Sequence, residues 1–217
     1  GPVGFLLSFT AAWLINEFST RLRTLFTLLF YLPTLAGNVY FVWMYIFTGD
    51  SYGFVNSTLM RIGIIREPII WLTDARYNFW VVVIVVLWMS MGTGFLAIVA
   101  ALQSLNSDLT EAGAIDGVKN RFQELWYIVL PQMVPILTFA AVMTVATSFS
   151  IGYQSMQLTG FPSTDYSTHT LVLHIMDSGF IKFEMGYAAA LSVILLFILL
   201  VVWKYLRLLL AKVGTAD

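Results

Sequence analysis

The charged residues of this chain are distributed so that five long stretches contain none of them, apart from their ends. An α-helix needs about 20 mainly apolar residues to cross a bilayer, and a charge in the middle of such a span is costly. The uncharged stretches approach this length and therefore predict membrane-spanning helices. We place the five spans near residues 1–17, 25–48, 77–102, 131–153 and 186–208.

The composition agrees with a membrane protein. Hydrophobic residues make up 59% of the chain and charged residues 11%, whereas soluble domains average about 45–50% and about 25%. The net charge of −1 and the lack of a basic run give no sign of nucleic-acid binding. The absence of cysteine excludes disulfides and thiolate metal sites. We therefore predict an all-α integral membrane protein with one domain over residues 1–217.

The segment between the third and fourth spans, residues 106–131, is polar and must lie at a water-exposed face. Asp108 is expected to accept the first free N–H groups of a short helix, with Glu111 three positions on as in a capping box. Gly117 can take a positive φ and end that helix. A second helix is predicted from apolar residues at helical spacing, which are Phe122, Leu125, Trp126 and Val129. Two prolines, Pro131 and Pro135, mark a new helix start or a kink.

Basic residues predict the orientation, because they concentrate on the cytoplasmic side of membrane proteins. Five spans put residues 106–131 on the same side as the C-terminus. That side carries Arg21, Arg23, Lys119, Arg121, Lys204, Arg207 and Lys212, and the other carries Arg61, Arg66, Arg76 and Lys182. We therefore expect residues 106–131 and the C-terminus to be cytoplasmic. The outer loops 49–76 and 154–185 are expected to hold short helices at the interface. Because this orientation puts Gly1 outside, a further span is expected before it.

A resemblance to a known family rests on the residues of this polar segment. Glu111, Ala112 and Gly113 are followed by Gly117 and then by Ile-Val-Leu-Pro at residues 128–131. This order resembles the signature loop of the membrane subunits of ABC importers, which reads Glu-Ala-Ala, three residues, Gly, nine residues, Ile-x-Leu-Pro. Here Gly113 replaces the second alanine, and the spacer after Gly117 has ten residues. We call residues 106–131 the signature loop.

Flanking segments at residues 101–105, 158–160, 169–172 and 183–192 are similar to the carbohydrate (maltose-type) branch of these binding-protein-dependent inner-membrane components. The resemblance implies the type I ABC importer permease fold and a sugar or oligosaccharide as solute. It also implies a second permease subunit, a pair of cytoplasmic ATPase subunits that carry ATP and Mg²⁺, an extracytoplasmic solute-binding protein and a surrounding lipid bilayer.

In such importers a helix of the signature loop, here about residues 108–116, docks in a cleft of the ATPase, and ATP binding there switches the path between its two openings. The coupling residues expected by resemblance are Glu111, Ala112, Gly113, Ile115, Asp116 and Gly117. Glu111 could instead only cap its own helix, and Asp116 could be a solvated turn residue. Lys119 and Arg121 are most simply cytoplasmic anchors.

Neutral polar and aromatic side chains near the spans could line a solute path, and they suit a sugar. The candidates are Asn38, Tyr40, Thr144, Thr147, Ser148, Tyr153 and Gln154. His169 and His174, five positions apart with no cysteine nearby, do not predict a metal site.

Several absences separate this function from its rivals. The chain has no G-x-x-x-x-G-K-[ST] sequence, so we expect it to bind no ATP or other cofactor itself. It lacks a mid-span charge, which argues against an ion-coupled secondary transporter. A membrane scaffold would not need a two-helix element with a glycine hinge, and no span holds the groups of an enzyme site. Import of another small solute stays an alternative to sugar.

Overall fold

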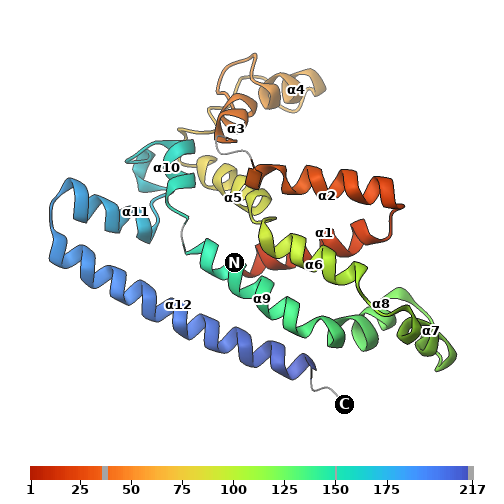
Figure 1. Cartoon of the computed structure of the whole chain (residues 1–217). Coiled ribbons are helices and arrows are strands. Elements are labelled where there is room, and N and C mark those ends of the chain that lie inside the picture. Colours follow the sequence, from red (N-terminus) through yellow and green to blue (C-terminus); the bar gives the residue numbers. More distant parts are fainter. Residues whose placement is uncertain (36–38, 150, 215–217) are drawn as a thin grey trace. The chain divides into compact units, whose positions relative to one another are not determined.

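The computed structural model describes residues 1–35, 39–149 and 151–214, and all regular elements in these ranges are helical. Figure 1 follows them along the chain. The chain groups into two compact units. Unit 1 combines residues 1–34, 90–148 and 197–217, and unit 2 combines residues 35–89 and 149–196. Each unit is thus assembled from segments that are distant in the sequence.

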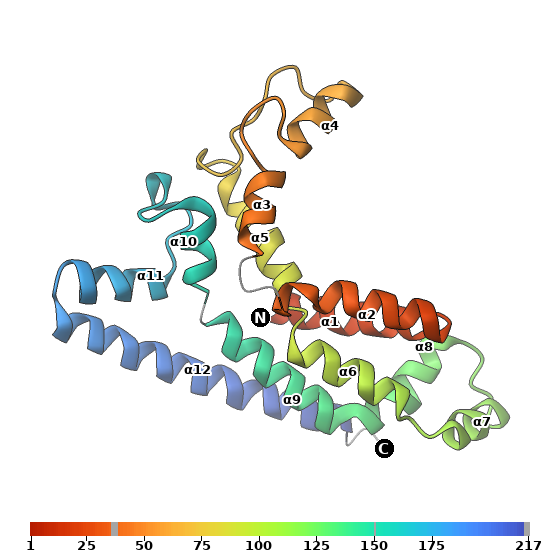
Figure 2. The same cartoon turned by 45° about the horizontal axis from the view of Figure 1, so that its top comes forward.

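Unit 1 is built on three helices that pack side by side: α1 (Pro2–Asn16), α6 (Thr93–Gln103) and α9 (Leu130–Ser148). Figure 2 shows α6 between the other elements of this group. Their contact surface is apolar and well buried, with Ala12, Phe95, Ile98, Met133 and Ala140 at its centre. The unit also holds α2 (Thr20–Leu35), α7 (Ser107–Ile115) and α8 (Arg121–Glu124). This core holds both ends of the signature loop.

Unit 2 contains α3 (Tyr40–Ile46), α4 (Phe54–Ile62), α5 (Asn78–Met89), α10 (Tyr153–Thr159) and α11 (Leu171–Met176), with a 3₁₀ turn (Thr164–Tyr166) and a π turn (Asp177–Ile181). The fully buried Asn56 organises loop 49–76. Its amide donates to the carbonyls of Thr48, Asp50 and Ile69 and accepts from Ile69 N–H and Trp71 Nε1. The predicted short helices of the two outer loops are therefore present.

The last helix, α12 (Met185–Gly214), begins in unit 2 and ends in unit 1. Its most apolar window, within Met185–Leu206, is only 6% buried. A helix that is apolar and exposed on nearly all sides needs lipid or another membrane chain around it.

The structure supports fewer spans than the five predicted. Among the described residues, two helices are long and apolar enough to cross a bilayer, residues 121–148 and 185–206, and α5 with α6 makes a third if this bent pair is one span. Within the predicted span 25–48, the structure describes helix up to Leu35 in α2 and again from Tyr40 in α3, and residues 36–38 lie outside the described residues. Gly92, at φ −100° and ψ −140°, interrupts the helix between α5 and α6. The span predicted to end at residue 153 ends at Ser148.

Candidate functional site

The first helix of the signature loop, α7, starts differently from the prediction. Its N-cap is Asn106, whose side chain accepts a hydrogen bond of 3.0 Å from Asp108 N–H. Asp108 therefore lies inside the first turn, where its charge suits the helix dipole, and does not cap the helix. The Glu111 side chain is exposed and makes no hydrogen bond or ion pair with any described residue, so the capping box is absent. The predicted cap was wrong because Asn106 offers an equally good acceptor two residues earlier.

The end of α7 is as predicted. Gly117 has φ +98° and would meet no atom within 4 Å if it carried a Cβ. Val118 N–H donates to the carbonyl of Gly113 at 2.9 Å, and Gly117 N–H donates to that of Ala114 at 3.4 Å. This pair of bonds is a Schellman motif, which needs a left-handed residue after the helix. Gly117 is thus required by backbone conformation and not by lack of space.

The two parts of the signature loop pack together through Gly113. This glycine is buried, and a Cβ there would overlap the Cδ1 atom of Ile128. The glycine that replaces the usual alanine therefore makes room for Ile128, which belongs to the Ile-Val-Leu-Pro end of the same motif. The substitution lowers helix propensity by about 1 kcal/mol but brings the two helical parts into contact.

The second half of the loop begins at α8, whose N-terminus is capped by two side chains. The Asn120 side chain accepts from Gln123 N–H at 2.8 Å, and the Gln123 side chain accepts from Lys119 N–H at 2.9 Å. The helix then continues without a break to Ser148. Regular α-helix resumes at Leu130, so Pro131 is the second residue of α9, in agreement with the predicted helix start, and Pro135 lies inside α9.

A π turn at Leu125–Val129 joins α8 to α9, and Leu130 N–H donates to the carbonyl of Leu125. A π turn accommodates one extra residue in an α-helix, and the spacer of this loop is one residue longer than the resembling pattern. Pro131 follows directly and has no N–H to continue the α-helical bonds. The extra residue is therefore absorbed at one turn. Side chains before and after the π turn keep the relative directions that they would have in a helix one residue shorter.

The outer surface of α7 is open. Ile115 is 87% exposed and Leu109 is 47% exposed, and Ala112 and Asp116 are also exposed. A hollow of about 390 Å³ lies on one side, lined by residues that include Leu109, Ala112, Asp116 and Tyr127. The exposed surface of α7 therefore carries apolar side chains together with two carboxylates, Glu111 and Asp116.

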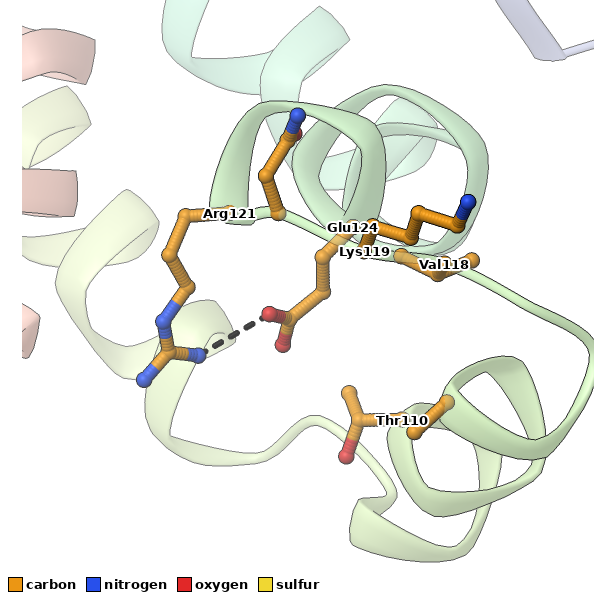
Figure 3. A pocket seen from close by; sticks show the side chains of 7 residues that line it. Thr110, Val118, Lys119, Arg121 and Glu124 are labelled. Carbon is orange, nitrogen blue, oxygen red and sulfur yellow. Dashed lines mark hydrogen bonds and ion pairs between the residues drawn. The ribbon is translucent and has the colours of Figure 1, made fainter.

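A second hollow of about 260 Å³ separates α7 from the start of α8. Figure 3 shows Glu124 and Arg121 reaching each other on one side of it, with Thr110 of α7 opposite. Arg121 Nη1 lies 2.9 Å from Glu124 Oε2, and its Nη2 lies 3.2 Å from Glu17 Oε2 at the end of α1. The hydrogen bond to Glu124 and the negative charge of Glu17 raise the pKa of Arg121.

The ion pair between Arg121 and Glu17 was not predicted. Arg121 was expected only as a cytoplasmic anchor, yet it joins the loop to α1, and its neighbour Phe122 packs on Trp13 with ring centroids 5.5 Å apart. No local pattern in the sequence could reveal a contact between residues so far apart along the chain.

The solute-path candidates fall into two groups. In unit 1, Thr144, Thr147 and Ser148 lie within about one turn of α9 and donate to carbonyls of that helix. In unit 2, buried Tyr40 and half-exposed Tyr153 pack edge to face with centroids 5.8 Å apart. Gln154 follows Tyr153 and has a buried side-chain oxygen that no described residue hydrogen-bonds. Asn38 lies outside the described residues.

The two histidines lie together in unit 2, with ring centroids 5.6 Å apart. His169 stacks on Phe161, and His174 contacts Tyr187, with 3.3 Å between Nε2 and the hydroxyl. Among the described residues, no group of three or more His, Asp or Glu side chains is placed to hold a metal ion.

Long apolar helices, with a capped, glycine-ended loop between two of them, are typical of an integral membrane protein. The chain belongs to the family of binding-protein-dependent transport system inner membrane components, whose sequence profile matches residues 4–212.

Relatives agree with this assignment. The chain is 30% identical over 199 residues to the lactose transport system permease protein LacF of Rhizobium radiobacter. This alignment covers 89% of this chain and 65% of that protein. It is 31% identical over 170 residues to the sn-glycerol-3-phosphate transport system permease protein UgpA of Agrobacterium fabrum, covering 77% and 55%. The chain thus spans less than two thirds of the length of these relatives.

The fold is also found in a solved structure. A bacterial ABC transporter involved in the import of the acidic polysaccharide alginate contains a chain that superimposes with a TM-score of 0.81 at 23% identity, covering 99% of this chain and 74% of that one. This likeness shows the fold of the present chain.

Proposed function

We propose that this chain is the permease subunit of an ATP-driven importer and moves a sugar or oligosaccharide across the cytoplasmic membrane by alternating access. In this proposal the signature loop and the C-terminus face the cytoplasm, and the bilayer is crossed five times near the predicted positions, in part by shorter or bent helices such as the pair α5 and α6. A separate ATPase pair binds ATP and Mg²⁺, a second permease subunit completes the path, and a soluble binding protein delivers the solute from outside. This chain needs no cofactor of its own.

The exposed face of α7 is the observation that carries the proposal. Both ends of this short helix are fixed, by Asn106 at the start and by the Schellman motif at Gly117. Its inner side packs on Ile128, which lies in the π turn of the helix that runs from Arg121 to Ser148. Glu111 and Ile115 remain exposed on it. A fixed helix that is continuous with a span can pass a push from a soluble partner into the membrane, and the open face offers that partner a place to bind.

The proposed solute follows from neutral groups and from the relatives. The candidate path residues are hydroxyl, amide and aromatic side chains, which bind sugars through hydrogen bonds and ring stacking. LacF is named for lactose transport. The likeness to UgpA keeps another small solute, such as a glycerol phosphate, as the alternative. A phosphorylated solute would bind best to basic side chains in the path. None of the predicted spans carries a charge in its middle, which favours a neutral sugar.

A charge reversal tests the docking surface. In the reconstituted importer, Glu111→Lys is expected to weaken copurification of the ATPase and to reduce both uptake and the ATPase activity stimulated by the binding protein. Glu67→Lys makes the same charge change at an exposed position of loop 49–76, and it should leave copurification of the ATPase unchanged. Normal copurification and uptake in Glu111→Lys would show that α7 does not dock through this face.

A further inference from the structure

We propose that Arg121 is a positioning residue that fastens the signature loop to the end of α1, so that movement of the loop is passed to that helix as well as to α9. The inference rests on the proposed function, because it concerns how the ATPase-driven movement spreads through this chain. It assigns Arg121 a role separate from the docking face on α7.

The guanidinium of Arg121 is shared between two carboxylates from different parts of unit 1. Its Nη1 lies 2.9 Å from Glu124 Oε2 in the loop, and its Nη2 lies 3.2 Å from Glu17 Oε2, at the residue that closes α1. The planar fork of an arginine can serve two acceptors at once, which the single ammonium of a lysine does with poorer geometry. Arg121 therefore sets the distance and the direction between the loop and α1.

A second contact stands beside the ion pair. Phe122 packs on Trp13 with ring centroids 5.5 Å apart and an angle of 53° between the rings. Trp13 and Glu17 are four residues apart, so they share one face at the end of α1. Two adjacent residues of the loop thus contact two residues of one helical face. One contact alone would allow the loop to rotate about it, and two contacts prevent that rotation.

The π turn keeps these contacts in place. Each residue of an α-helix turns the chain by about 100°, so the extra residue of the spacer would rotate Arg121 and Phe122 away from their present direction relative to Val129. The π turn at Leu125–Val129 absorbs that residue. Val129 packs in the core shared with α1 and α9, and Arg121 and Phe122 remain directed at the end of α1.

The contact is suited to positioning and not to holding the fold. The side chains of Arg121 and Glu17 are 64% and 42% exposed, and exposed ion pairs contribute little to folding free energy. Loss of Arg121 should therefore leave a folded subunit whose α1 no longer follows the loop.

The experiment is a double-mutant cycle in proteoliposomes that contain the complete importer, meaning this chain in its full-length form with its ATPase, second permease subunit and binding protein. Arg121→Ala and Glu17→Ala should each lower the number of solute molecules moved per ATP hydrolysed by several-fold, while the ATPase still copurifies. The double variant should be no worse than either single variant, because both remove the same contact. Arg121→Lys should recover part of the loss.

Lys119→Ala is the matched control, because Lys119 is an exposed cation of the same loop and no ion pair joins its side chain to a described residue. It should leave transport per ATP unchanged. Unchanged transport per ATP in Arg121→Ala, or losses from the two single variants that simply add, would overturn the inference. If the unmodified chain neither binds an ATPase nor transports, the proposed function itself fails, which is a distinct result. Should Arg121→Ala not fold, Phe122→Leu tests the second contact and must show the same loss.

Discussion

Ile128 occupies the space that a side chain at Gly113 would need, and this contact joins the two ends of the signature loop. Gly113 belongs to the Glu-Ala-Gly start of the motif, and Ile128 opens its Ile-Val-Leu-Pro end. The two parts of the motif are therefore neighbours in space, and the departure of Gly113 from the usual alanine has a packing reason.

This contact predicts non-additive stabilities. Gly113→Ala gains about 1 kcal/mol of helix propensity but must displace Ile128, so its net effect should be small. Ile128→Val removes the clashing methyl and costs about 0.5–1.5 kcal/mol. The double variant should be more stable than the sum of the single changes, as measured by thermal unfolding in detergent. Strictly additive effects would show that the two residues are not in contact.

Gly117 is predicted to be intolerant of a side chain because of its φ of +98°. Gly117→Ala should cost about 1–3 kcal/mol of strain or open the Schellman motif, and uptake should fall. Gly63→Ala is the matched control, since Gly63 has φ +81° with equally open surroundings but lies after α4, outside the signature loop. If both variants lose uptake to the same degree, the effect is general instability and not a change in the loop.

The π turn predicts an unusual tolerance of a deletion. Trp126 is 62% exposed within the turn, and its removal should convert residues 121–148 into a regular α-helix without rotating Arg121 relative to Val129. Uptake should therefore be largely retained. Insertion of one alanine after Tyr127 instead adds a rotation of about 100° and should abolish uptake. Lower uptake in the deletion variant than in the insertion variant would contradict the role given to the π turn.

His169 predicts a loss of stability in acid. Burial, followed by the charges of His174 and Lys182, lowers the pKa of His169 below its ordinary 6.5, while Asp177 opposes the shift. The folded state then resists protonation, so stability is full above pH 6.5 and falls as the pH drops below that value. His169→Phe keeps the ring packing on Phe161, and it removes no hydrogen bond between Nδ1 and any residue that the structure describes. Between about pH 7.5 and about pH 5.5 this variant should lose less stability than the parent protein, as measured by thermal unfolding. An equal loss in both proteins would contradict the lowered pKa of His169.

The sequence predicts features that depend on one residue or on regular spacing. Gly117 was expected at a positive φ because glycine alone adopts it without strain, and the Schellman motif confirms it. The all-helical class followed from the lengths of the uncharged stretches. The N-cap of α7 was missed because Asn106 and Asp108 are both good caps, and spacing does not decide between them.

Other features depend on contacts that no local pattern encodes. The apolar spacing from Phe122 to Val129 fits an α-helix and a π turn about equally well, so the π turn was not predicted. The Arg121–Glu17 pair joins two segments that only the packing of α1 against α9 brings together.

The central claim is that the exposed face of α7 lies in the cytoplasm and binds the ATPase. The chain contains no cysteine, so Ala112→Cys would provide a single reactive thiol on that face, at an exposed position. A membrane-impermeant maleimide should modify it in inside-out vesicles that lack the ATPase, leave it unmodified in right-side-out vesicles, and react far more slowly once the ATPase is bound. Modification from the outside, or a rate that the ATPase does not change, would contradict the account.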